Sequence, residues 1–361
     1  MKKIIKLFSP KFDNKEISAA VNTIKSANWA SGSGRGNVEK FENKFCDYIN
    51  AKECVAVDNG TAALHLSLHL LNIKNKEILV PSFTFITTIH SIVYNGGIPI
   101  FVDIDPKSLC IDTNDLEKKI SKKTKGIINM HYGGFPNKIN DIKKISKKYQ
   151  LHIVDDAAHA CGAKNKNKKI GSENELTCFS FHPVKNLAMP KGGAITINTR
   201  DSKNLKEKLN SLRWCGIDKR VGTKYDITSL GYNYYMDEIS ASIGIEQLKK
   251  LDKMNEIRFK IAKKYNSNLN TREKMPISKD CSYHLFWIRV KNRHIFMKKM
   301  YAKGIETGSH YIPAHLTSYY KKNHKLPITE MVAKEVVTLP MHPNLTDEEI
   351  EFIIKTANSI I

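Results

Sequence analysis

Short apolar runs alternate, over the first 235 residues, with longer segments whose apolar positions recur at helical spacing. The apolar runs lie at residues 55–57, 78–80, 98–102, 127–128 and 151–154. The first four precede helical patterns at residues 61–71, 86–94, 114–120 and 139–149. Thr113 is the expected N-cap of the third helix. Strands alternating with helices are typical of βαβ units, so we predict an α/β fold with a mostly parallel central sheet between helices.

The pattern changes after about residue 235. We expect helices at 236–251 and 257–268, a strand-like run at 283–290, a helix at 294–302 and a closing helix from Asp347. This change predicts a large α/β domain at residues 1–250, with the N-terminal segment included. A smaller C-terminal α+β domain is expected at residues 251–361.

The charge balance is strongly basic. The 361 residues include 58 Lys and Arg against 36 Asp and Glu, a formal net charge of +22. The lysines are scattered in pairs such as Lys118-Lys119 and Lys143-Lys144, which is typical of solvated helix faces. We therefore expect no nucleic-acid partner, although a positive field favours an anionic small molecule.

Seven cysteines are spread along the chain without a CxxC motif, which argues against a zinc site or a disulfide framework. The basic N-terminus has no long apolar stretch. No apolar run approaches the roughly 18 residues of a membrane span. We expect a cytoplasmic protein with reduced thiols, no metal and no membrane partner.

Residues that follow the strands are candidates for a binding site, because ligands of open α/β sheets bind beyond the carboxyl ends of the strands. These residues are Asp58 to Thr61, Pro81 to Phe85, His131 to Gly133, and Asp155-Asp156. The stretch CFSFHPVKNLAMPKGGAITIN adds Lys185, which stands between two apolar runs that are typical of buried strands. Ser180 and His182 precede it.

Each of these features has an ordinary structural explanation. Gly60-Thr61 can simply begin a helix, Asp156 can be an N-cap, and Lys185 can be a surface lysine. Each also fits a chemical role. Helix-start amides bind phosphate, and a carboxylate followed by small alanines can hold a protonated ring nitrogen. A lysine among apolar residues has a lowered pKa and can form Schiff bases.

The combination fits one cofactor, pyridoxal phosphate (PLP). PLP needs a lysine that forms a Schiff base, an acidic partner for its ring nitrogen, a phosphate site and a flat contact surface. Each feature alone is a weak signal. Their order along the chain is more specific: a Gly-Thr helix start, an aromatic after Pro81, then DDAAHA, then SFHPVK.

These motifs resemble those of the DegT/DnrJ/EryC1/StrS family of sugar aminotransferases, which has fold type I of the PLP enzymes. The resemblance extends over nearly the whole chain. It is carried by ANWASGSGRGNVEKFE, NGTAALHLSL, PSFTFITTIHSIVYNGGIPIFVDID, MHYGGFPNKIN, DDAAHACGA, FSFHPVKN, GGAITIN, LGYNYYMDEISASIGIEQL, TGSHYIPAH and LPMHPNLTDEEI.

The resemblance implies roles for individual residues. Lys185 would bind the cofactor covalently and move protons between cofactor and substrate carbon. Asp156 would pair with the pyridinium nitrogen. His159 would lie near the phenolic oxygen of the cofactor, and Phe85 would cover its ring.

Further residues are implied around the cofactor. Those expected to hold the phosphate are Gly60, Thr61, Ala62 and Ser180, with Asn233 reaching it from a partner subunit. The active unit would then be a homodimer with a shared site. His310 and Tyr311 would border the sugar or the amino donor.

Two departures from the family pattern are visible. Asp155 stands where the family often has Glu, and NKIND follows MHYGGFP where an acid-Met-Asp sequence is common. Relatives that deoxygenate a sugar carry His at the position of Lys185. The lysine therefore indicates transamination.

The implied reaction moves an amino group from L-glutamate to a nucleotide-linked keto-deoxysugar, with pyridoxamine phosphate as the intermediate form of the cofactor. MHYGG resembles the HYAG sequence motif of enzymes that aminate C4 of a sugar. This resemblance favours a 4-keto-6-deoxyhexose as substrate and a 4-amino-4,6-dideoxy sugar as product. Such products supply surface polysaccharides, glycoprotein glycans or secondary metabolites. The alternatives are a 3-keto nucleotide sugar, a keto-inositol, or a non-catalytic regulator that binds PLP or sugar.

Overall fold

A computed structural model describes residues 4–321 and 324–361, and within them seven strands form one central sheet. Their order is β1 (Glu53–Val57), β9 (Gly193–Ile197), β8 (Leu176–Ser180), β5 (His152–Asp156), β4 (Thr124–Met130), β2 (Glu77–Pro81) and β3 (Ile98–Val102). Strand β9 is antiparallel to both neighbours, and the other neighbouring pairs are parallel. The mostly parallel sheet predicted from the sequence is confirmed.

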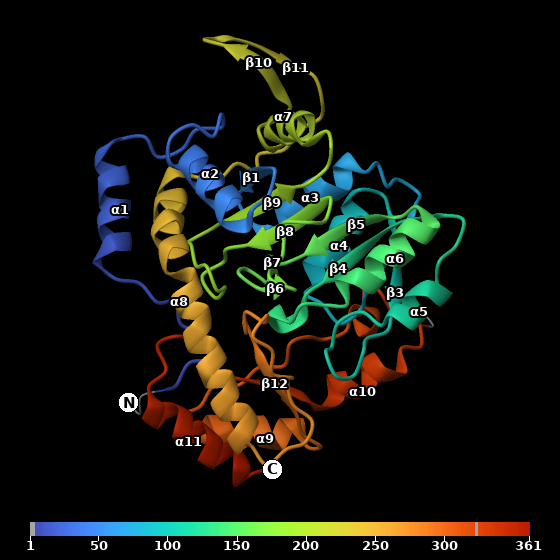
Figure 1. Ribbon diagram of the computed structural model, residues 1–361, viewed down its shortest axis with the longest axis vertical. Coiled ribbons are helices and arrows are strands. Elements are labelled where there is room, and N and C mark those ends of the chain that lie inside the picture. The colour runs from blue at the N-terminus through green and yellow to red at the C-terminus, as the bar shows by residue number, and fades with distance from the viewer. Residues whose placement is uncertain (1–3, 322–323) are drawn as a thin grey trace.

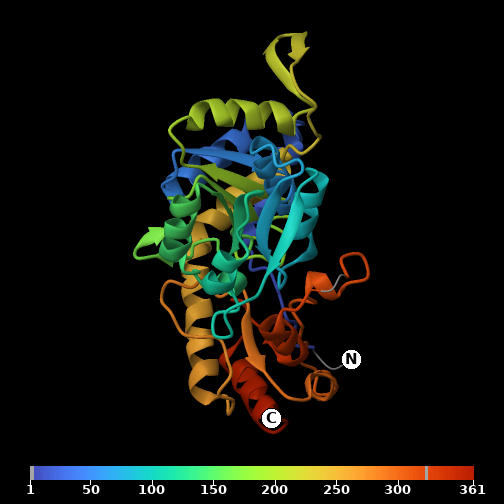
Figure 2. The same cartoon turned by 90° about the vertical axis from the view of Figure 1, so that its right-hand side faces the viewer.

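Helices cover both faces of this sheet (Figures 1 and 2). One face packs against α3 (Gly60–Leu70), α4 (Ile86–Tyr94) and α7 (Ser202–Arg213). The other packs against α2 (Asn37–Ile49), α5 (Thr113–Lys118), α6 (Ile139–Tyr149) and the start of α8 (Glu238–Asn268). Successive strand residues point to opposite faces, so Val55 joins the first core and Ala56 the second.

Several predicted element bounds are confirmed, and two details are wrong. Strand β3 and helices α4 and α6 span the predicted residues. The N-cap of α5 is Asp112, not Thr113, because the Asp112 carboxylate accepts the N–H groups of the first turn. The two helices expected at 236–251 and 257–268 are one helix, α8. Its polar middle looks like a break in the sequence, but Met254 is buried there and continues the packed face.

The C-terminal part is built on β12 (Phe286–Arg289) and β13 (Val336–Leu339), which pair antiparallel. They are surrounded by α9 (Arg293–Ala302), α10 (Pro327–Glu335), α11 (Asp347–Asn358) and the second half of α8. The strand expected from residue 283 begins at Phe286, because Tyr283 has a φ of 47° and is not extended.

The N-terminal segment packs with this C-terminal part. Ile5 forms a parallel bridge with Ile305, and both side chains are buried in the same core. Helix α8 runs without interruption from the large part into the C-terminal part (Figure 1). A domain boundary at residue 250 falls inside this helix, and the division into residues 1–250 and 251–361 stays a prediction.

Two elements project from the sheet and its helices. Helix α1 (Asn14–Lys25) lies along α8, and the hairpin of β10 (Ile217–Val221) and β11 (Lys224–Ile227) extends beyond α7 in both views (Figures 1 and 2). A small hairpin joins β6 (Lys164–Asn165) and β7 (Lys168–Lys169), and short 3₁₀ turns lie at Tyr132–Gly134 and Ala314–Leu316.

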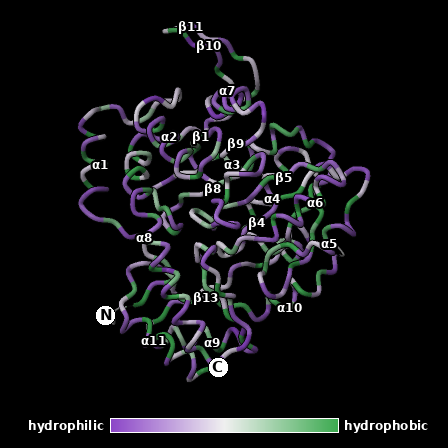
Figure 3. Tube along the Cα trace, in the orientation of Figure 1, coloured by the Kyte–Doolittle hydropathy of each residue, from purple (hydrophilic) through white to green (hydrophobic). Residues whose placement is uncertain are grey.

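Hydrophobic and hydrophilic positions are interleaved along the trace, as expected for elements with one buried face (Figure 3). Among the described residues, no helix combines the length and the apolar character needed to span a membrane.

Candidate active site

A cavity of about 400 Å³ lies at the carboxyl ends of the sheet strands, where the C-terminal part meets the sheet. Its lining includes nine residues predicted from the sequence: Gly60, Thr61, Phe85, Asp156, His159, Ser180, Lys185, His310 and Tyr311. Ala62 and Asn233, which were also predicted, are outside this lining. The structure therefore brings most of the predicted residues together at one edge of the sheet.

Lys185 lies on the loop between β8 and β9. The loop is fixed by backbone bonds from Lys185 to His182, at 2.8 Å, and from Met189 to Phe181, at 2.7 Å. Burial lowers the pKa of Lys185 to about 8, against the opposing charge of Asp156. The Lys185 Nζ lies 3.4 Å from the Nε2 of His284. A lysine with this pKa has a substantial neutral fraction near physiological pH, as a nucleophilic amine requires.

Asp156 ends β5 and is buried. Its Oδ2 accepts a hydrogen bond of 2.7 Å from Thr88, and its Oδ1 accepts one of 3.1 Å from the Ala158 N–H. Burial raises the pKa of this carboxyl, while these bonds oppose the rise. A cationic group in the cavity would favour the ionised form.

Asp155 points to the opposite face of β5, because side chains alternate along a strand. It accepts hydrogen bonds from Asn129, at 2.8 Å, and from Asn174, and its Oδ1 lies 3.4 Å from His131 Nε2. Burial raises the pKa of Asp155, but the bonds from His131, Asn174 and Asn129 hold it below its usual value. This buried network fixes the strand that carries Asp156.

The start of α3 faces the cavity. Asn59 caps the helix by accepting the Ala62 N–H at 2.8 Å, which places Ala62 in the helix interior and away from the lining. Within the described chain, the N–H groups of Gly60 and Thr61 have no acceptor. A Cβ on Gly60 would lie 2.7 Å from the Cβ of Ser180, so glycine permits this close approach.

Aromatic side chains form the opposite wall. Phe85 is the N-cap residue of α4 and is about half exposed, with its ring 5.8 Å from that of Tyr311. The Tyr311 hydroxyl lies 2.8 Å from His159 Nε2. His310 is held by Thr338, 2.8 Å from its Nδ1, and its carbonyl accepts a hydrogen bond from Tyr132.

Phe8, Thr88 and His284 line the cavity but were not predicted. His284 is buried, and its ring stacks on Phe8 at 5.4 Å and lies 4.4 Å from that of His159. The position of His284 directly before the apolar run 285–288 was the one available signal. Phe8 and Thr88 have no local pattern that distinguishes them from core residues.

Asn233 is exposed at the base of the projecting hairpin, where it bridges to Trp214. It is outside the lining of its own chain's cavity, and its contact with a partner subunit stays a prediction.

The cavity fits PLP on the chemistry of its side chains. Lys185 supplies the amine, and Asp156 supplies a buried carboxylate that a protonated ring nitrogen would neutralise. The free amides of α3 and the Ser180 hydroxyl are donors suited to phosphate.

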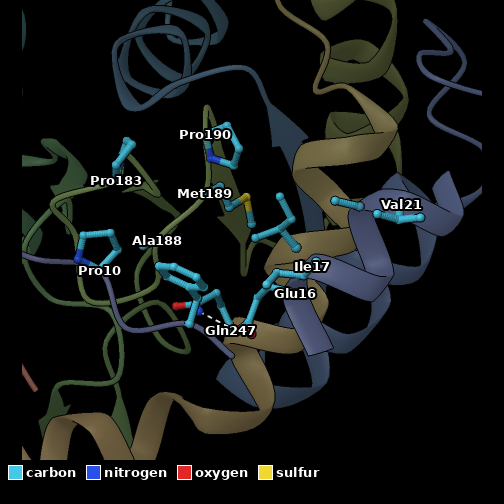
Figure 4. Close-up of a pocket in the computed structure, with 12 residues that line it drawn as sticks. Pro10, Glu16, Ile17, Val21, Pro183, Ala188, Met189, Pro190 and Gln247 are labelled. Atoms are coloured by element: carbon cyan, nitrogen blue, oxygen red, sulfur yellow. Dashed lines mark hydrogen bonds between the residues drawn. The ribbon is translucent and has the colours of Figure 1, made fainter. Parts of the chain in front are cut away.

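A second cavity of about 480 Å³ lies between α1, the loop at 183–190 and α8 (Figure 4). Its lining is almost entirely apolar. Its polar members Glu16 and Gln247 bond each other at 2.6 Å. A cavity with so few polar groups is not suited to the chemistry of the first.

Comparison with known proteins identifies close relatives. Residues 11–358 match the model of the DegT/DnrJ/EryC1/StrS aminotransferase family. An uncharacterized protein of Methanocaldococcus jannaschii, MJ1066, is 35% identical over 98% of this chain and 97% of its own length.

Solved structures agree over the whole fold. Spr1654 from Streptococcus pneumoniae, assigned as a sugar aminotransferase and solved in PLP and PMP forms, is 27% identical. In its PLP form it has a TM-score of 0.93, with 99% of this chain and 98% of that chain covered. PseC from Helicobacter pylori, an aminotransferase in pseudoaminic acid biosynthesis, is 25% identical with a TM-score of 0.92 and covers 99% of each chain.

Proposed function

The chain belongs to the DegT/DnrJ/EryC1/StrS aminotransferase family, and we propose that it transfers an amino group from L-glutamate to C4 of a nucleotide-linked 4-keto-6-deoxyhexose. As a member of the family it is a sugar aminotransferase with PLP as its cofactor. The observation that carries the proposal is the meeting of a low-pKa lysine, a buried carboxylate and free helix-start amides in one cavity.

Lys185 would attach the cofactor and carry a proton to and from the reacting substrate carbon. When bound, PLP withdraws electrons from that carbon and makes its proton labile. The lowered pKa of Lys185 suits both directions of proton transfer, since the amine gains and loses a proton near neutral pH. Asp156 would accept the ring N–H, with Thr88 and Ala158 fixing its oxygens.

The remaining lining would orient the bound molecules. Gly60, Thr61 and Ser180 would donate hydrogen bonds to the phosphate, with Ala62 setting the helix start behind them. Phe85 would cover the ring. His310 and Tyr311 line the cavity as well and would border the substrate.

The proposed identities of the sugar and of the amino donor are supported by the sequence and by the net charge. MHYGG, at the end of β4, supports amination at C4, and the net charge of +22 favours an anionic nucleotide sugar. PseC, a structural relative, is an aminotransferase in the biosynthesis of pseudoaminic acid. Glutamate is the donor implied by the family resemblance.

The active unit would be a homodimer. Ile17, Val21 and Ile24 form an exposed apolar stripe on α1, and the first two line the apolar cavity of Figure 4 beside the Lys185 loop. A second copy seated there would cover these residues. The same assembly would bring Asn233 to the partner's phosphate site.

Absorption spectra and product analysis test the proposal. The PLP-loaded protein should lose its visible absorption band when glutamate is added, and Lys185→Ala should show no such change. A dialysed enzyme given nucleotide 4-keto-6-deoxyhexose should then yield a 4-amino product by NMR. Turnover of a 3-keto nucleotide sugar in place of the 4-keto sugar would assign the chain to amination at C3, and no spectral response to glutamate would favour a regulator.

A further inference from the structure

The side chain of His159 is fixed at both ring nitrogens. Its Nδ1 receives a hydrogen bond of 3.2 Å from the backbone N–H of Gly133, and its Nε2 lies 2.8 Å from the hydroxyl of Tyr311. Its backbone carbonyl accepts a hydrogen bond of 2.9 Å from Ser282. The ring therefore has little freedom to turn.

The two bonds determine where the imidazole carries its proton. A backbone N–H can only donate, so Nδ1 must be the acceptor. Burial and nearby positive charge hold the pKa of His159 well below its usual value, so the ring is neutral. A neutral ring with a bare Nδ1 has its hydrogen on Nε2, and this hydrogen points at Tyr311. The opposite tautomer would set two N–H groups against each other at Gly133.

The hydroxyl of Tyr311 must then accept from His159, which leaves its own hydrogen for another partner. Within residues 4–321 and 324–361, His159 is the one hydrogen-bond partner of this hydroxyl. Tyr311 lines the cavity and lies beside Phe85. Burial and the charge of Asp156 raise the pKa of Tyr311, so it keeps its hydrogen across the working pH range.

We propose that Tyr311 is a hydrogen-bond donor to an oxygen anion or carbonyl oxygen bound in the cavity, and that His159 is the residue that positions it. This assigns to Tyr311 the contact that the sequence placed at His159. The oxygen belongs either to the cofactor, as its phenolic oxygen, or to the substrate. The inference rests on the proposed function for the identity of that oxygen, but the hydrogen-bond order is a property of the protein alone.

The hydrogen-bond order is measured by ¹⁵N NMR on the cofactor-free protein with labelled histidine. His159, assigned by comparison with His159→Gln, should show a protonated Nε2 and a bare Nδ1. Tyr311→Phe should shift its Nε2 resonance. Tyr132→Phe is the control. Tyr132 is outside the cavity lining and its hydroxyl bonds the His310 carbonyl, so its loss should leave the Nε2 resonance of His159 in place. A protonated Nδ1, or a doubly protonated ring at neutral pH, would overturn the proposal whatever the enzyme's substrate.

The bound oxygen is identified with the PLP-loaded protein and no substrate. If it is the cofactor's, Tyr311→Phe should raise the pH midpoint of the visible absorption band by about one to two units, because a lost donor makes the oxygen easier to protonate. If it is the substrate's, the midpoint should stay and kcat/KM should fall about tenfold to a hundredfold. If neither changes, Tyr311 is not the donor.

The positioning role of His159 has its own comparison. Glutamine can accept a hydrogen bond from Gly133 with its oxygen and donate one to Tyr311 with its amide. His159→Gln should therefore keep the pH midpoint and kcat/KM close to those of the unmodified protein. His159→Leu can do neither and should reproduce the change seen in Tyr311→Phe. Equal behaviour of the Gln and Leu variants would show that His159 acts by packing alone and overturn its positioning role.

Discussion

At the residue scale, the opposing effects on Lys185 decide how the site works. Burial disfavours its ammonium form, and the carboxylate of Asp156 favours it. The balance puts its pKa at about 8, below the ordinary value of a lysine. A lysine with this balance loses and regains a proton at little cost near neutral pH, which a surface lysine does not.

The rate of cofactor capture should follow this pKa. Only the neutral amine attacks the aldehyde of PLP, so uptake by the cofactor-free protein should rise about tenfold per pH unit below pH 8 and level off above it. Stopped-flow absorbance between pH 6 and 10 measures this profile. Lys185→Arg should capture no cofactor at any pH. A rate that still rises tenfold per pH unit between pH 9 and pH 10 would show that the pKa of Lys185 is not lowered.

The two adjacent aspartates should respond oppositely to the same substitution. Asp156→Asn keeps the side-chain shape but loses the charge that favours a protonated ring nitrogen, so kcat should fall about 10²- to 10³-fold. Asp155→Asn breaks a buried network on the other face of β5. It should lower the free energy of unfolding by about 1–3 kcal/mol and change kcat little.

Steady-state kinetics and urea unfolding of both variants make the comparison. The assignment fails if Asp155→Asn is the catalytically damaged variant while Asp156→Asn is not.

At the scale of elements, the cofactor site depends on how closely β9 approaches the start of α3. Gly193 pairs with Val57 on one side and with Ser180 on the other. A Cβ added to Gly193 would lie 2.5 Å from the backbone carbon and oxygen of Asn59. Because backbone atoms cannot turn aside as a side chain can, the N-cap of α3 would have to move.

Gly193→Ala should therefore weaken PLP binding about tenfold to a hundredfold, through displacement of the amides of α3. Gly222→Ala is the control for backbone strain alone: its φ of 62° disfavours alanine, but a Cβ there meets no atom within 4 Å and its hairpin lies away from the cavity of its own chain. Fluorescence titration with PLP gives both dissociation constants. Equal affinity in the two variants would refute the role of the close approach.

The elements also show what a sequence can predict. Local periodicity predicts the alternation of strands and helices that the structure has. It also predicts that Gly60, Asp156 and Lys185 meet at one edge of the sheet, where they line the same cavity. The single helix α8 was divided in two, because its polar middle is helical only through packing around Met254. Phe8 and His284 reach the site through docking of the N-terminal and C-terminal segments, which no local pattern encodes.

At the scale of the whole molecule, α1 carries an apolar stripe that no element within residues 4–321 and 324–361 covers fully. Ile17, Val21 and Ile24 follow helical spacing and are 50%, 40% and 49% exposed. Helix α1 also packs on α8, where Gln247 donates a hydrogen bond to Glu16. A contiguous exposed apolar stripe of this kind is typical of a protein interface. The apolar cavity beside this stripe is also lined by Pro183 and Met189, so an interface here would affect the loop that carries Lys185.

Ile17→Asp should therefore convert dimer to monomer and weaken PLP binding, because a buried unpaired charge opposes association and Asn233 would no longer reach the partner's phosphate site. Ile295→Asp is the control, since Ile295 is also an exposed helical isoleucine, at 54%, but lies on α9 in the C-terminal part. Analytical ultracentrifugation gives the mass of each variant, and PLP titration gives its affinity. If Ile17→Asp stays dimeric with full affinity while Ile295→Asp dissociates, the interface lies on the C-terminal part, and the apolar stripe of α1 serves another contact.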